Sequence, residues 1–217
     1  MRLPVFTSFI LIVILTNIAI HRNDAKIRKN EEDFWDKELR ANSTRRKSLD
    51  SLNYIRVPLD KLPFGAVKGN DEIDFCERTI TRLADQKIVN LTGITNTDLK
   101  LEYGAPNITS LTTYDQNYTT LVTNLQKWGK ELYDASLYKE ATDVLEFSIS
   151  TKTDVTATYK LLCDLYKNKL SLSSSESSAK IRSLIPVAES LNSLSKENIL
   201  SILHEALGEV PANEQFA

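Results

Sequence analysis

The sequence predicts an all-α protein, and three observations support that fold class. Apolar side chains after residue 70 recur at spacings of three and four, the period of amphipathic helices. Glycine is scarce, with 6 in 217 residues, and the alternating stretch at residues 54–64 contains prolines, which a central β-strand does not tolerate. A long uncharged run near the N-terminus is typical of a membrane helix. We therefore expect antiparallel helical hairpins stacked as a short array, preceded by a single N-terminal transmembrane helix and an extended strap.

The N-terminal segment, residues 1–22, is predicted to be a transmembrane signal anchor. No side chain of residues 3–20 is charged, and such a run makes about 27 Å of helix, enough to cross a lipid bilayer. A cleaved signal peptide is the alternative, but no small-x-small site comes after the run, so we favour an uncleaved anchor. Residues 3–20 are then expected to contact the bilayer.

Two signals disagree on the side of the membrane that the C-terminal body occupies. More basic residues come after the run than before it, which favours a cytoplasmic body. An apolar segment with so short a leader commonly directs the rest of its chain across the membrane. We expect a single-pass protein with an extracytoplasmic body, and a cytoplasmic body is the alternative.

Two linking segments come before the helical domain. Residues 23–53 carry many charges of both signs and are predicted to form a charged helical stalk and linker. Residues 54–69 contain Pro58 and Pro63, each of which pushes the preceding residue into extended backbone. We expect these residues to form an extended strap laid across a helical surface.

Residues 70–208 are predicted to form the helical domain, and residues 209–217 a loose tail. Its first helix starts at a cap at Asn70 or Asp71, and its apolar stripe continues to Ile88. Residues 90–109 break the helical period. Since so long a connection is uncommon in a compact domain, they form either a functional loop or contain a hidden short element.

Further helices are expected along the rest of this domain. A proline should kink or end the fourth of them, and a glycine closes the last. The last helix is expected to cap the stack, with a role as a docking helix for a partner as the alternative. The expected helices run from about Asp115 to Asp134, from Tyr138 to Ser150, from Thr156 onward, from about Ser177 past Pro186, and from Lys196 to Leu207 before Gly208.

A set of large and small residues recurs 34 positions later in this domain. Leu125, Trp128, Gly129 and Leu132 correspond to Tyr159, Leu162, Cys163 and Tyr166, large matching large and small matching small. A small residue at that point lets two helices cross closely. With this period, residues 122–155 resemble one tetratricopeptide repeat, and residues from 156 onward resemble a second, degenerate one. The usual turn glycine and closing proline of the repeat are Ser136 and Thr153 here.

This resemblance implies a protein–protein interaction scaffold, and the layout is similar to that of uncharacterised membrane-anchored bacterial proteins. Tetratricopeptide domains bind peptide segments in a groove lined by the first helix of each repeat. The lysines among the matching positions suit an acidic or extended protein segment, although ordinary exposed polar residues would give the same pattern. The alternative function is a structural spacer in an envelope complex, with residues 54–64 or 91–106 filling the groove. The groove positions implied by the register are Gln126, Lys130, Tyr133, Lys160, Asp164 and Lys167.

The sequence contains no arrangement typical of a catalytic or metal site. The only histidines, His21 and His204, lack an HExxH spacing, and Cys76 and Cys163 lie in no CxxC motif. Two buried thiols are expected, with one disulfide as the alternative in an exported chain. The few glycines fit neither GxxxxGK nor GxGxxG, and the net charge of -2 gives no general attraction to nucleic acid. We expect no enzymatic activity, catalytic residue, metal, cofactor or nucleic-acid partner.

Overall fold

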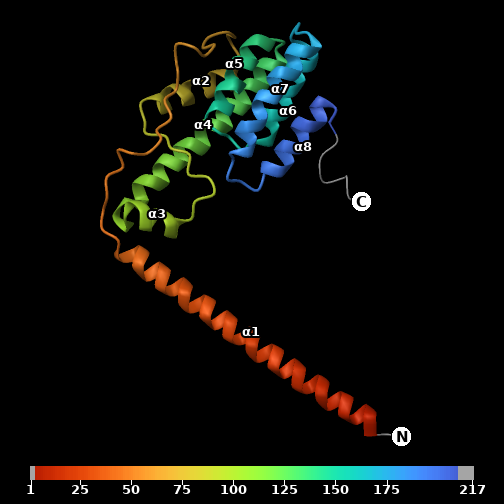
Figure 1. Cartoon of the computed structure of the whole chain (residues 1–217). Helices are drawn as coiled ribbons and strands as arrows, with labels where there is room; N and C mark the ends of the chain where they lie inside the picture. The colour runs from red at the N-terminus through yellow and green to blue at the C-terminus, as the bar shows by residue number, and fades with distance from the viewer. Residues whose placement is uncertain (1–2, 210–217) are drawn as a thin grey trace. The chain divides into compact units, whose positions relative to one another are not determined.

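A computed structural model describes residues 3–209 of the chain, and the side chains of residues 11–18, 20–24 and 26–209. Over these residues the chain is helical and forms no strand, which confirms the all-α expectation (Figure 1). Two short turns interrupt the α-helices: the 3₁₀ turn η1 (Ala105–Asn107) and the π-helical turn η2 (Leu165–Lys169). The helices are α1 (Leu3–Ser43), α2 (Asp71–Ala84), α3 (Asn96–Tyr103), α4 (Ile108–Asp134), α5 (Tyr138–Ser150), α6 (Thr156–Asp164), α7 (Ser174–Glu189) and α8 (Lys196–Leu207).

The chain divides into two compact units. The stalk unit comprises Met1–Leu49 and Thr95–Ile108, and the body comprises Asp50–Ile94 and Thr109–Ala217. Helix α1 runs through the predicted anchor and into the predicted stalk without a break, as far as Ser43. No helix in the part of the chain that the structure describes is long and apolar enough to cross a membrane.

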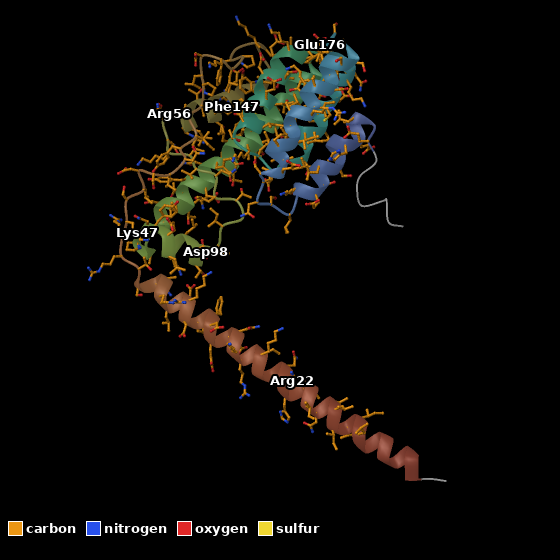
Figure 2. All side chains as sticks on the ribbon, in the orientation of Figure 1. Arg22, Lys47, Arg56, Asp98, Phe147 and Glu176 are labelled. Carbon is orange, nitrogen blue, oxygen red and sulfur yellow. The ribbon has the colours of Figure 1, made fainter. Side chains whose placement is uncertain are left out.

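Polar contacts join α1 to α3 in the stalk unit. The ammonium of Lys37 lies 2.7 Å from the Asp98 carboxylate, and Lys100 forms an ion pair with Glu38. Farther along, the buried amide of Asn107 donates hydrogen bonds to the carbonyl oxygens of Lys47, at 2.8 Å, and Tyr103, at 2.7 Å. Figure 2 labels Lys47 and Asp98 in this unit. Helix α3 is the hidden short element, which resolves the alternatives for residues 90–109.

The helices of the body match the expected elements closely at some ends and less closely at others. The Asn70 side chain caps α2 by accepting hydrogen bonds from two backbone N–H groups, at 3.0 and 3.2 Å. Helix α2 ends at Ala84, so Ile88 is buried beyond the helix. Helix α4 begins at Ile108, well before the expected start near Asp115. Helices α5 and α8 have the expected bounds, and Pro186 lies in the last turn of α7.

One apolar core holds the body together, and α2, α4, α5, α6, α7 and α8 all contribute to it. Helices α4 and α5 cross tightly at Gly129, where a Cβ atom would lie 2.6 Å from Cδ2 of Leu145. This close approach supports the expected need for a small residue at that position. The corresponding Cys163 of α6 is buried as well. The stacking expected from the tetratricopeptide resemblance stays a prediction.

The predicted strap lies against this core, but only its first part is extended: residues 54–58 contain no turn, whereas residues 59–69 consist mainly of turns and bends. The backbone N–H of Ile55 donates to the carbonyl of Ile88 at 2.9 Å, beside an isolated bridge between Tyr54 and Val89. Further along, the Phe64 ring packs 5.0 Å from the ring of Trp128 on α4. The strap therefore covers part of the core surface that would otherwise be exposed to water.

Candidate protein-docking face

The groove positions implied by the sequence fall on two neighbouring helices of the body. Three of them lie on α4 and repeat every three or four residues, so they share one side of that helix. The same spacing recurs on α6 and continues into η2. We call this surface the α4–α6 face, and it comprises Gln126, Lys130, Tyr133, Lys160, Asp164 and Lys167.

A direct hydrogen bond joins the two helices across this face. The hydroxyl of Tyr133 on α4 donates to Oδ2 of Asp164 on α6, at 2.6 Å. Asn168 donates to the other carboxylate oxygen of Asp164, at 2.7 Å. Of the six predicted residues, Tyr133 and Asp164 are therefore brought together, and their bond fixes α4 beside α6.

The sequence pattern missed two residues that complete this contact, Tyr138 and Lys169. The rings of Tyr133 and Tyr138 pack edge to face, with centroids 5.5 Å apart. The ammonium of Lys169 lies 5.5 Å from both ring centroids, within the range of a cation–π interaction. Lys169 ends the π-helical turn η2, in which the N–H of Leu170 bonds to the carbonyl of Leu165. A π turn changes which side chains share a side of the helix, and such turns are frequent at functional sites.

The pKa values in this cluster depend on its hydrogen bonds. The bond to Asp164 is the main cause that raises the pKa of Tyr133, and burial adds to it. Burial acts to raise the pKa of Asp164, but the hydrogen bonds from Tyr133 and Asn168 together outweigh burial and lower it. The pKa of Lys169 is raised, chiefly by its interaction with Tyr133. At neutral pH Asp164 is therefore a carboxylate, Lys169 an ammonium and Tyr133 a neutral phenol.

The remaining predicted residues do not converge on one point. Lys130 forms an ion pair with Asp134 on its own helix. The ammonium of Lys167 donates to the carbonyl of Ala206 at the end of α8, at 2.8 Å. Lys160 is exposed and has no hydrogen bond or ion pair within the described part of the chain, and Gln126 is half-buried. On the face itself, Lys160 and Lys167 therefore carry positive charge that no carboxylate within residues 3–209 pairs, and Lys169 is an exposed lysine beside the face.

The strap and the loop after α2 make their contacts elsewhere in the body. Residues 55–64 bond to Ile88 and pack on Trp128. The N–H of Leu91 donates to Asp115, and the carbonyl of Gly93 accepts from Asn192. Among the described residues, no hydrogen bond, ion pair or ring contact joins residues 55–69 or 85–94 to the six residues of the α4–α6 face.

No group of three or more His, Cys, Asp or Glu side chains within residues 3–209 has an arrangement that could hold a metal ion. Cys76 and Cys163 are free and buried, which confirms the expectation of two thiols. Burial raises the pKa of Cys163 to about 11 and also raises that of Cys76, so neither supplies a reactive thiolate at neutral pH.

The start of the predicted tail is held in place. Oε2 of Glu209 lies 2.9 Å from Nδ1 of His204, and Arg182 pairs with its other carboxylate oxygen at 2.7 Å. The rest of the tail, residues 210–217, lies outside the described residues.

Comparison with known proteins gives one result: no family model, curated protein or solved structure matches the chain.

Proposed function

We propose that this protein is a single-pass, membrane-anchored helical-repeat scaffold whose α4–α6 face binds an acidic or extended segment of a partner protein. The main support is the Tyr133–Asp164 hydrogen bond, which fixes two helices side by side and leaves lysines exposed beside it. A cationic helical face suits an extended acidic segment, since ammonium groups attract carboxylates.

The proposed anchor is supported by the exposed surface of α1. The side chains of residues 11–15 are all apolar and 46% to 60% exposed. Because five consecutive residues cover every side of an α-helix, this part of α1 is apolar all round, as expected for a helix surrounded by lipid. The hydroxyl of Thr16 donates to the carbonyl of Ile12 at 2.9 Å, so it needs no water. The side chains of residues 3–10 lie outside the described residues.

Peptide binding to the full chain in detergent micelles tests the docking proposal. Two labelled peptides are compared by fluorescence anisotropy, one rich in Asp and Glu and the other with Lys at those positions. We expect the acidic peptide to bind preferentially, with an affinity that falls as salt is added. The double variant Lys160→Glu/Lys169→Glu should weaken its binding by at least about tenfold, a change of about 1.4 kcal/mol.

The matched control is Lys68→Glu, which makes the same charge change at an exposed lysine of the strap. The loss of peptide affinity in this control should be less than half of the loss in the single variants Lys160→Glu and Lys169→Glu. Equal loss in the control, or equal binding of the two peptides, would show that the attraction is not specific to the α4–α6 face. Extraction of the protein from membranes by carbonate would contradict the proposed anchor without deciding the docking face.

A further inference from the structure

A polar cavity of about 250 Å³ lies in the body, where α5 and α7 both end. The cavity is distant from the α4–α6 face. Helix α5 begins at Tyr138, beside that face, and ends at the cavity about 20 Å away. Four segments separated in the sequence line the cavity: the strap, the loop after α2, the turn after α5 and the turn after α7. The lining includes Asn90, Lys152, Asp154, Asn192 and Ser193.

Specific contacts hold these segments around the cavity. The amide of Asn90 donates to the carbonyls of Thr151, at 3.2 Å, and Lys152, at 3.1 Å, at the end of α5. The amide of Asn192 donates to the carbonyl of Gly93 at 2.9 Å. Gly93 has a φ of +79°, and a Cβ atom there would lie 2.1 Å from the backbone oxygen of Asn192. Only glycine allows this approach, so the loop after α2 is fitted closely against the turn after α7.

The lining offers many hydrogen-bond acceptors, and its side-chain donors that have no acceptor among the described residues belong to Asn53, Thr92 and Lys152. The amides of Asn90 and Asn192 already donate to backbone carbonyls. Four of the lining hydroxyls also donate to oxygen atoms of the chain, which leaves their own lone pairs available. These bonds run from Ser150 to the Phe147 carbonyl (2.6 Å), from Thr151 to the Ser148 carbonyl (2.7 Å), from Ser190 to the Val187 carbonyl (2.7 Å) and from Ser193 to the Asp154 carboxylate (2.5 Å).

The charges around the cavity favour a cation. The C-terminal end of a helix carries a partial negative charge, and two helices end here. Asp154 adds a carboxylate that is half-buried. Its Oδ2 accepts from Ser193, and its Oδ1 has no hydrogen bond among the described residues. The one basic side chain of the lining, Lys152, is exposed, so it can turn toward solvent.

We propose that this cavity binds the alkylammonium or guanidinium group of a ligand, with Asp154 as the counter-charge. Such a group has only donors, which suit the carboxylate, hydroxyl and carbonyl acceptors of the lining, and a positive charge, which the helix ends favour. The volume is smaller than that of a typical pocket for a drug-sized molecule, so it suits a short alkylamine or a single side chain. This site is independent of the α4–α6 face and of the function proposed for that face.

Calorimetric titration of the full chain in detergent micelles tests the proposal. The probes are n-butylammonium and n-butylguanidinium, with butyrate and butanol as probes of the same chain length. We expect saturable binding of the two cations, and no binding of butyrate. Asp154→Asn retains an oxygen for Ser193 but removes the charge, and should raise the Kd of the cations at least about tenfold. The matched control Asp60→Asn, at an exposed strap residue, should leave the Kd unchanged.

A second arm distinguishes a free amine from a side chain of a partner protein. If n-butylammonium binds at least about tenfold more tightly than the peptide acetyl-Gly-Lys-Gly-amide, the ligand is a small amine. If the peptide binds equally well or better, the ligand is a lysine side chain. Butanol binding as tightly as n-butylammonium, or Asp154→Asn binding the cations as the unaltered chain does, would overturn the proposal.

Discussion

The two tryptophans of the chain lie in opposite surroundings. Trp128 in the body is fully buried and packs on Phe64, whereas Trp35 in the stalk unit is 62% exposed and contacts only its exposed neighbour Phe34 among aromatic rings of the described residues. The difference extends to the units that contain them. Every member of the apolar core cluster belongs to the body. The stalk unit buries few apolar side chains, among them Ala41 and Leu99, and ion pairs and the hydrogen bonds of Asn107 also join it. Apolar burial is therefore much more extensive in the body, and polar contacts have a larger share in the stalk unit.

Replacement of each tryptophan by alanine tests this comparison with the largest expected effect. Trp128→Ala should lower the free energy of unfolding of the body by about 3–5 kcal/mol, because it removes a large side chain from a packed core. Trp35→Ala, the matched variant, should change the free energy of unfolding of the stalk unit by less than about 0.5 kcal/mol. Denaturant titration followed by circular dichroism measures both changes. Similar losses in the two variants would show that the units do not differ in this way.

Within the stalk unit, loss of the buried side-chain amide of Asn107 should cause the largest destabilisation. Asn107→Ala leaves the carbonyl of Lys47 without its donor and the carbonyl of Tyr103 with only the backbone N–H of Lys47, and should destabilise this unit by about 1–3 kcal/mol. We expect faster amide hydrogen exchange in α3 and unchanged exchange in α5. Asn96→Ala is the control, because Asn96 is exposed on α3 itself. If both variants accelerate exchange equally, the buried hydrogen bonds are not the cause.

Acid should weaken the contact between α1 and α3, and this effect should be smaller than that of Asn107→Ala. Hydrogen bonds from Lys100 and Thr97 lower the pKa of Glu38 below its usual 4.5, and those from Lys37 and Thr95 lower the pKa of Asp98 below its usual 3.8. Since both values are lowered by folding, this stabilisation is complete at neutral pH. It is lost as the pH falls below these usual values and through the lowered ones.

Chemical shifts of the α3 amides, measured by NMR during acid titration, report this loss. Glu38→Gln should reduce the pH dependence, whereas Glu32→Gln, on an exposed part of α1, should not. Added salt should act in the same direction as acid, because these side chains are partly exposed. A contact that is insensitive to both pH and salt would indicate that apolar packing joins α1 to α3.

The helices were predictable where periodic apolar residues and end signals agree. Helix α8 shows an apolar face, and Gly208 at its end has a φ of +73°. The start of α4 was missed because its first turns are rich in threonine and contain one buried apolar residue, Leu111. The short helix α3 likewise has one buried side chain, Leu99, so its stripe is too brief to detect.

The candidate sites were predictable only where their residues lie in a helical register. The register placed Tyr133 and Asp164 on one face, and the structure joins them. Lys169 was not predictable, because its position depends on a π turn that no sequence spacing indicates. The cavity beside Asp154 is assembled from four segments whose approach depends on tertiary contacts such as that of Gly93 with Asn192. The amino-acid sequence alone does not indicate that these segments approach each other.

Mapping of the bound acidic peptide on the full chain is the most direct test of the docking face. Backbone amide shifts of the isotope-labelled protein are compared with and without the peptide. We expect the largest changes to cluster in residues 126–133 of α4 and 160–169 of α6 and η2, and to vanish in Lys160→Glu/Lys169→Glu. Changes concentrated in α2, α7 or α8, with these two stretches unaffected, would contradict the proposed docking face.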